Sequence, residues 1–255
     1  MQLARRARRV YKQNFIIIYM RINKVKDITH ANKEKLAEFL GIMLGDGNIY
    51  SKNGTHRIVV TGHCEEDYDY LVNYIKPLIK NLFGLEASLW KHKNKNAIAL
   101  SVCSKRIVEN LNLLGLNAGP KTMRIPKFIK SNKIYITNFI RGVADTDFSM
   151  TFKKKHHAYP LITGSFSNKE FTEEIRQLLG LLDIKANLYS GCRNGFMIYQ
   201  LDIYGRENLD KWMKFIGFSN PKHLTKIAIW NKIGYYEPYT PYGERLKILE
   251  QCVVK

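Results

Sequence analysis

The chain has 255 residues, of which 45% are hydrophobic, and it carries 41 Lys and Arg against 22 Asp and Glu, a formal net charge of +19. This length supports a buried core in one or two domains, but the apolar run Phe15 to Met20 is too short for a membrane span of about 20 residues. The four cysteines lie far apart with no CxxC spacing, which argues against a structural zinc site and against a disulfide framework.

The charge points to a partner of opposite sign. A net charge of +19 repels itself in a compact fold, and phosphates relieve that repulsion while releasing bound counterions. We therefore expect a nucleic-acid partner, with a soluble basic protein that has no such role as the alternative. The reduced thiols expected here fit an intracellular protein that is not secreted, in a prokaryotic cytoplasm, archaeal included, or in an organelle.

Residues 1–30 are predicted to be a basic N-terminal extension. Arg5, Arg6, Arg8 and Arg9 open the chain, and the first acidic residue is Asp27. An organellar transit peptide is the second interpretation of this composition.

The chain contains an internal repeat. Residues 41–47 (GIMLGDG) match residues 142–148 (GVADTDF), with an offset of 147 − 46 = 101. Residues 119–121 (GPK) and 220–222 (NPK) keep the same offset, 222 − 121 = 101. An ordered series at one offset indicates duplication. We predict a first half over 31–125 and a second over 126–255, joined by a linker at about 121–134.

Both halves are predicted to follow the order αββαββα. In the first half, apolar residues at helical spacing, the Asn53-Gly54 turn signal and alternating strand-like runs set the elements. The predicted order there is helix 33–45, hairpin 49–60, helix 65–83 with Pro77 as a kink or break, hairpin 87–102 and helix 105–114. The second half has strands near 150–154 and 161–166, a helix over 169–182, a hairpin turning at 193–195 and a helix ending near Gly217. The fold class is therefore α+β with a duplicated unit and antiparallel sheets.

The two matching segments predict a metal site. Gly41 and Gly45 share one helix face, as Gly142 and Thr146 do, and small residues at this spacing let two helices approach closely. Packing those helices together would bring the aspartates that follow them into proximity. Two such carboxylates repel unless a cation lies between them, and their oxygens suit Mg²⁺. The simpler interpretation is that each aspartate only ends a core helix.

These segments resemble the paired motifs of the LAGLIDADG homing endonucleases, and the resemblance covers about 33–233. It implies that the motif helices form the interface between the halves and that the two antiparallel sheets lie as a saddle over double-stranded DNA. By matched position, it implies metal-binding acids at Asp46 and Asp147, backbone carbonyl ligands at Gly45 and Thr146, and catalytic lysines at Lys121 and Lys222. The spacing from acid to lysine is equal in the halves, since 121 − 46 and 222 − 147 are both 75.

The resemblance also implies two or three Mg²⁺ ions at the interface, with Mn²⁺ as an expected substitute, and a monomer that requires no protein partner and no membrane. Two positions depart from the family pattern. Leu44 replaces an acid that Asp145 keeps in the second half, and Phe148 replaces the final glycine. The second change puts the geometry of the helix exit in question and predicts unequal metal environments.

The strands are expected to present polar side chains to DNA, because alternate residues of a strand share one face. The DNA contacts that we predict are Asn48, Tyr50, Lys52, Arg57, Thr61, His63, Lys91 and Lys93 in the first half, and Ser149, Thr151, Lys153, Lys155, Thr163, Ser165 and Arg193 in the second. Trp90 and Trp230 are expected in the core.

The function predicted is a site-specific endonuclease that makes a staggered double-strand break and promotes mobility of its host intron. Two alternatives are an RNA maturase that assists splicing on the same scaffold and a DNA-binding regulator that does not cleave. An intein is a further possibility, but a free-standing or intron-encoded protein is expected to fit this sequence better. Retention of both aspartates and both lysines argues against the regulator.

Overall fold

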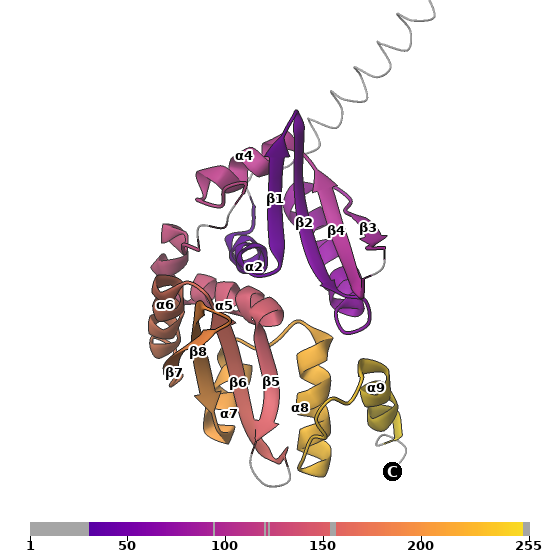
Figure 1. Cartoon of the computed structure of the whole chain (residues 1–255), viewed down its shortest axis with the longest axis vertical. Helices are drawn as coiled ribbons and strands as arrows, with labels where there is room; N and C mark the ends of the chain where they lie inside the picture. Colours follow the sequence, from indigo (N-terminus) through magenta and orange to yellow (C-terminus); the bar gives the residue numbers. More distant parts are fainter. Residues whose placement is uncertain (1–30, 94, 120, 122, 154–156, 252–255) are drawn as a thin grey trace, which may run out of the picture.

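The computed structural model describes residues 31–93, 95–119, 121, 123–153 and 157–251. The predicted N-terminal extension, and Lys155 among the predicted DNA contacts, lie outside this range. The described chain has two halves of like architecture that meet through the helices α2 and α5 (Figure 1). The α+β fold with two antiparallel sheets is therefore confirmed.

The first half follows the predicted order. Its elements are α2 (Lys33–Leu44), β1 (Gly47–Lys52), β2 (Thr55–His63), the π-helix η2 (Tyr70–Ile75), α3 (Lys76–Phe83), β3 (Ser88–Lys91), β4 (Ala97–Cys103) and α4 (Lys105–Leu113). The expected start of the second helix, near residue 65, was wrong, because residues 64–66 form a turn before it. The break predicted at Pro77 appears as a change of helix type, with the Lys76 N–H donating to the carbonyl of Leu71, five residues earlier.

The second half repeats this order and then extends it. Its elements are α5 (Lys133–Asp147), β5 (Phe148–Lys153), β6 (Tyr159–Phe166), α6 (Lys169–Gly180), β7 (Asn187–Arg193), β8 (Phe196–Tyr204), α7 (Arg206–Phe215), α8 (Pro221–Ile233) and α9 (Tyr242–Gln251). The helices α8 and α9 were not predicted. In the segment predicted as a linker, a short 3₁₀ helix, η3 (Lys127–Ser131), buries Ile129, and α5 begins at Lys133.

The two sheets have equivalent topology. The strand orders are β1-β2-β4-β3 and β5-β6-β8-β7, with every neighbouring pair antiparallel. Asn53 and Gly54 have φ of 50° and 73°, and Asn194 and Gly195 have φ of 51° and 80°. Consecutive positive φ angles are what tight two-residue hairpin turns require, so both sequence signals for turns are confirmed.

The halves meet where α2 crosses α5, and two glycines set the distance. A Cβ added to Gly41 would lie 2.2 Å from the carbonyl oxygen of Phe139, and one added to Gly142 would lie 2.1 Å from that of Glu38. The backbones are therefore in direct contact. Beside the crossing, Arg141 forms an ion pair with the buried Glu38 at 2.9 Å.

The C-terminal helix α9 joins the two halves at a second place. Arg245 is fully buried and forms an ion pair with Glu66, in the turn after β2, while it also donates to the carbonyl of Lys222 in α8. Tyr242 adds a hydrogen bond from its hydroxyl to Asp69 at 2.8 Å. This helix fixes the start of α8 against the first half.

Within the part of the chain that the structure describes, we find no helix with the length and apolar character that a membrane crossing needs.

Candidate active site

Asp46 and Asp147 lie together at one end of the α2–α5 crossing. Asp147 is the last residue of α5, and Asp46 follows the end of α2 by two residues. A Cβ on Gly45, next to Asp46, would lie 2.7 Å from the Oδ2 atom of Asp147 and 1.9 Å from the Oγ1 atom of Thr146. Because Gly45 has no side chain, the carboxylate of Asp147 can lie against the backbone next to Asp46.

The pKa values of both acids are raised. Burial, and after it the charge of Asp147, raise the pKa of Asp46 to about 7, while the charges of Lys222 and Lys121 oppose that rise. Burial raises the pKa of Asp147 to about 6 against the opposing charges of Lys121 and Lys222. Raised pKa values at a partly buried pair of like charge are typical of a site that a cation completes.

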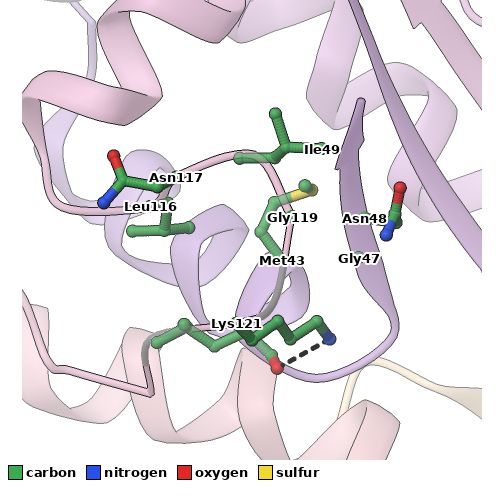
Figure 2. Close-up of a pocket in the computed structure, with 9 residues that line it drawn as sticks. Met43, Gly47, Asn48, Ile49, Leu116, Asn117, Gly119 and Lys121 are labelled. Atoms are coloured by element: carbon green, nitrogen blue, oxygen red, sulfur yellow. Dashed lines mark hydrogen bonds between the residues drawn. The ribbon is translucent and has the colours of Figure 1, made fainter. Parts of the chain in front are cut away.

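Lys121 reaches the end of α2, as Figure 2 shows. Its Nζ donates to the carbonyl of Leu44 at 2.9 Å and also to the carbonyl of Gly45. Burial lowers the pKa of this amine, and the charges of Asp147 and Asp46 oppose that change. Lys121 lines a small pocket between α2, β1 and the loop at 116–121. The carbonyl oxygen of Gly45, a predicted metal ligand, thus accepts a hydrogen bond from the ammonium group of Lys121. The oxygen therefore faces a position where a positive charge is already bound.

Lys222 is held differently. It forms an ion pair with Asp67 of the first half at 2.9 Å. Asp67 also accepts from the backbone N–H of His63 and from the Nδ2 atom of Asn220, each at 2.8 Å. Burial tends to raise the pKa of Asp67, but the charge and hydrogen bonds of Lys222 outweigh it, so the pKa is lowered.

Asp67 was not among the predicted site residues. Its counterpart at the repeat offset is Asn168, which caps α6 by accepting from the N–H of Phe171 at 2.7 Å. The unequal pair, an acid in one half and a neutral cap in the other, is the sequence signal that would have indicated Asp67.

Asp145 supports the backbone that carries Lys222. It is fully buried and accepts from the N–H groups of Ser219 and Asn220, each at 3.0 Å. Burial raises its pKa to about 7, and those two hydrogen bonds oppose the rise. Its counterpart Leu44 is buried with no such role. The acid at this motif position therefore fixes the start of α8 rather than joining Asp46 and Asp147.

Phe148 stands at a helix exit that differs from the first, because α5 runs through Asp147 whereas α2 ends at Leu44. Its ring is buried, packs edge-on against Phe166 and tilted against Trp212, and lies over Gly164, where a Cβ would come within 2.8 Å of it. In the first half a Cβ on Gly47 would lie 2.5 Å from the Cα atom of Met43. The chain after α2 is thus packed closely through Gly47, whereas the chain after α5 is packed through the ring of Phe148.

The donor atoms fit a hard divalent cation. They are two carboxylates at the helix ends, beside the Gly45 carbonyl that now accepts from Lys121. Mg²⁺ in proteins uses one or two carboxylates, completing its shell with water and phosphate. Among the described residues there is no group of three or more His, Cys, Asp and Glu that would hold a metal. The site therefore suits Mg²⁺ better than zinc.

Most predicted DNA contacts share one face of each sheet, the face opposite the helices. The register puts Asn48 beside Val59 and Tyr50 beside Arg57, and it puts Ser149 beside Thr163. Residues directly opposite one another in a sheet share a face. The residues on these outer faces are Asn48, Tyr50, Lys52, Arg57, Thr61 and His63 in the first sheet, and Ser149, Thr151, Lys153, Thr163, Ser165 and Arg193 in the second.

Three residues are placed differently. Lys91 pairs with Ile98, which is buried on the helix side, so it lies in the other row at the sheet edge, and Lys93 lies beyond the end of β3. Trp90 was expected in the core, but it is 37% exposed in the outer row opposite Ala99. His63 lies in the outer row, and its Nδ1 atom accepts from the N–H groups of Glu65 and Glu66 at 3.3 Å.

Comparison with known proteins agrees with this geometry. Residues 135–217 match the family model of a LAGLIDADG-like domain. The matched residues lie within the second half of the chain. The resemblance to the LAGLIDADG homing endonucleases is confirmed.

Two solved structures have the same fold. The homing endonuclease I-DmoI in complex with DNA and Mn aligns with a TM-score of 0.53 and 20% identity, covering 74% of this chain and 99% of that one. The N-terminal LAGLIDADG domain of DUF199/WhiA aligns with a TM-score of 0.50 and 18% identity, covering 74% of this chain and 85% of that one. The first alignment includes both halves.

Curated relatives match over part of their length. The tRNA-splicing ligase RtcB of Pyrococcus furiosus is 26% identical over 220 residues, 76% of this chain and 22% of that protein. The replication factor C small subunit of Thermococcus kodakarensis is 28% identical over 205 residues, 77% of this chain and 21% of that protein. The chain thus spans about a fifth of the length of these relatives.

Proposed function

We propose that this chain is a site-specific LAGLIDADG endonuclease that makes a staggered double-strand break in DNA by Mg²⁺-dependent hydrolysis. The observation that carries this proposal is the meeting of Asp46 and Asp147 at the α2–α5 crossing, with Lys121 and Lys222 close enough to shift their pKa values. A structural role for the aspartates alone would not explain two partly buried acids placed against each other with two lysines around them.

The chemistry needs one bond broken and one formed. Water attacks phosphorus, the bond from phosphorus to the 3′ oxygen breaks, and that oxygen takes up a proton. Asp46 and Asp147 would hold Mg²⁺ with the carbonyls of Gly45 and Thr146, and the ion when bound supplies Lewis acidity for water and phosphate. Lys121 and Lys222 place positive charge beside the carboxylates, where they orient water and stabilise the charge that develops on the phosphate.

Double-stranded DNA is the substrate that the surface favours. The net charge of +19 favours a polyanion, and the outer faces of both sheets carry hydroxyl, amide and basic side chains. Such groups contact phosphates and base edges in the major groove. Because one chain contains both halves, a monomer suffices to place one acid near each strand, and no protein partner is required.

The comparisons support the same proposal. The I-DmoI structures include complexes with target DNA in the presence of Mg or Mn. The two relatives carry unrelated names, a ligase and a replication factor. In each of them, the part that matches this chain is about a fifth of the relative's own length. A module shared by otherwise unrelated proteins is what a mobile element predicts, so we propose that cleavage promotes mobility of the element that encodes the chain.

Cleavage of a DNA library tests the proposal. The full chain is incubated with plasmids that carry fragments of the uninterrupted host gene, with Mg²⁺, with Mn²⁺ or with EDTA, and the new ends are sequenced. We expect staggered ends at one sequence with either metal and none with EDTA. Sequence-specific binding without breaks would instead indicate a regulator, and selective binding of intron RNA would indicate a maturase.

Asp67 gives a prediction about the two strands. Asp67→Asn removes the negative charge that holds Lys222 while it keeps the side chain's shape, and Lys121 is held instead by the carbonyls of Leu44 and Gly45. We expect one strand to be cut about 10-fold more slowly, the size of losing one charged hydrogen bond of about 1.5 kcal/mol, while the other strand is cut at the original rate. Single-turnover cleavage of DNA labelled on each strand measures the ratio.

Glu86→Gln is the matched control, because Glu86 is an exposed acid of the same half that pairs with Lys80. It is expected to leave both strand rates unchanged. Equal slowing of both strands by Asp67→Asn, with an unchanged melting temperature, would remove Asp67 from the positioning of Lys222.

A further inference from the structure

The outer face of the second sheet carries a buried acid at its centre. Asp202 in β8 is 4% exposed. Its Oδ1 atom accepts from the Oγ1 atom of Thr163 at 2.6 Å and from the Nε2 atom of Gln200 at 2.8 Å, and its Oδ2 atom accepts from the hydroxyl of Tyr204 at 2.6 Å. We call these four residues the Asp202 cluster.

The cluster lies where DNA contacts are proposed. Asp202 is directly opposite Thr163, and Gln200 is opposite Ser165, so Asp202 and its partners share the outer row with two predicted contacts. Gln200 and Tyr204 flank Asp202 two residues away on the same strand, and alternate strand residues share a face. An acid in the middle of a surface that approaches a polyanion weakens binding by charge repulsion. Its presence there therefore calls for a specific role.

The first sheet has no such cluster. At the repeat offset of 101 the counterparts of Gln200, Asp202 and Tyr204 are Ala99, Ser101 and Cys103. Those side chains include no carboxylate and no amide. The fold itself therefore does not require an acid at this position, and the cluster is a property of the second half alone.

The proton arrangement of the cluster follows from its central carboxylate. An ionised carboxylate only accepts hydrogen bonds, so Thr163 and Tyr204 must each direct their single hydroxyl proton at Asp202. The hydrogen bond to Asp202 raises the pKa of Tyr204 well above its ordinary value, so that hydroxyl keeps its proton. Gln200 directs one amide N–H at Asp202, which also fixes the direction of its carbonyl. The oxygens of Thr163, Gln200 and Tyr204 face outward as hydrogen-bond acceptors, and Tyr204 also has a hydrogen bond with Tyr189 of the neighbouring strand β7.

We propose that Asp202 is a specificity-determining residue, which turns Thr163, Gln200 and Tyr204 into a fixed set of acceptors that selects a base with an exocyclic amino group. In the major groove those bases are cytosine and adenine, whereas guanine and thymine offer acceptors there. This inference rests on the proposed DNA-binding function. Asp202 acts through its neighbours and need not touch DNA itself.

Selection from a random duplex library tests the proposal. The full-length protein selects DNA in EDTA, so that cleavage does not intervene, and the enriched base frequencies are compared with those of Asp202→Asn. The Asn amide adds a donor that one of the two hydroxyls must accept, so that hydroxyl's proton turns outward. We expect a change of about 3- to 10-fold toward guanine or thymine at one or two adjacent positions, the value of a typical single hydrogen bond, and no change elsewhere.

Asp210→Asn is the matched control, because Asp210 is an exposed acid of the same half that pairs with Arg206. It removes the same charge and is expected to leave the base preferences unchanged. If Asp202→Asn raised affinity equally for every sequence, as Asp210→Asn would through charge alone, the proposal would be overturned. Failure of the wild-type protein to enrich any sequence would instead contradict the proposed DNA-binding function.

Two further variants keep the test decisive if Asp202→Asn does not fold. Tyr204→Phe retains the ring and Thr163→Val retains the shape, and each removes one acceptor oxygen from the cluster. We expect each to weaken the preference at the same one or two positions by about 3-fold. An unchanged base profile in both folded variants would contradict the inference.

Discussion

Gly142→Ala is expected to destabilise the protein by about 3 kcal/mol and to abolish cleavage. The added Cβ would lie 2.1 Å from the carbonyl oxygen of Glu38 and 2.9 Å from the backbone nitrogen of Ile42. Both contacts are to backbone, so no side-chain rotation relieves them and α2 must move away from α5. Because Asp46 and Asp147 meet through this crossing, a shift of the helices separates them as well as loosening the interface.

Urea unfolding followed by circular dichroism measures the loss of stability, and a single-turnover cleavage assay measures activity. Gly180→Ala is the matched control. Gly180 ends α6, and a Cβ there meets nothing within 4 Å, so the substitution is expected to stabilise the fold by about 0.5 kcal/mol and leave cleavage unchanged. Equal stability of Gly142→Ala and the wild-type protein would contradict the direct backbone contact between α2 and α5 at Gly142.

The glycines at the helix crossing also show which features of the fold could be predicted from the sequence. Their four-residue spacing predicted that two helices meet, and the repeat offset predicted which two, because both are periodic signals that a single chain displays. The two hairpin turns at Asn53-Gly54 and Asn194-Gly195 were predictable for the same local reason. The meeting of Asp46 and Asp147 followed from these features together.

What the sequence concealed depends on long-range pairing. Asp67 contacts Lys222 across 155 positions, 222 − 67, and Arg245 contacts Glu66 across 179 positions. No local pattern marks such partners, and only the comparison of Asp67 with Asn168 at the repeat offset sets Asp67 apart. The start of α8 was a different case, because Asn220 caps it and Pro221 stands at its first turn, which is a recognisable helix start.

The errors at Trp90 and Lys91 share one cause. Strand β3 is short and at the sheet edge, so all four of its residues are exposed and hydrophobicity does not reveal which face each occupies. Pairing with β4 decides it, placing Trp90 in the outer row and Lys91 in the row of Ile98. On an edge strand the register must be known before a residue is assigned to the DNA face.

Asp46→Asn and Asp147→Asn are each expected to lower the cleavage rate by about 1,000-fold or more, while affinity for the target changes by less than about 3-fold. Each substitution keeps the side chain's size but removes the negative charge that a divalent cation requires. Affinity should persist because most of the contacts proposed for DNA are spread along the outer faces of the sheets and do not involve these two carboxylates. Single-turnover cleavage in Mg²⁺ and binding in EDTA measure the two quantities separately.

Loss of folding would not explain such a result. The two carboxylates are partly buried and repel each other, since burial and the charge of Asp147 raise the pKa of Asp46 to about 7. Removing either charge relieves that repulsion, so the melting temperature in EDTA is not expected to fall. Asp69→Asn serves as the control at an acid that bonds Tyr242 in α9, and it should leave the rate within about 2-fold. Cleavage at the wild-type rate by either Asp46→Asn or Asp147→Asn would contradict a cation site shared between the halves, because two equivalent acids are only useful there if each supplies a ligand.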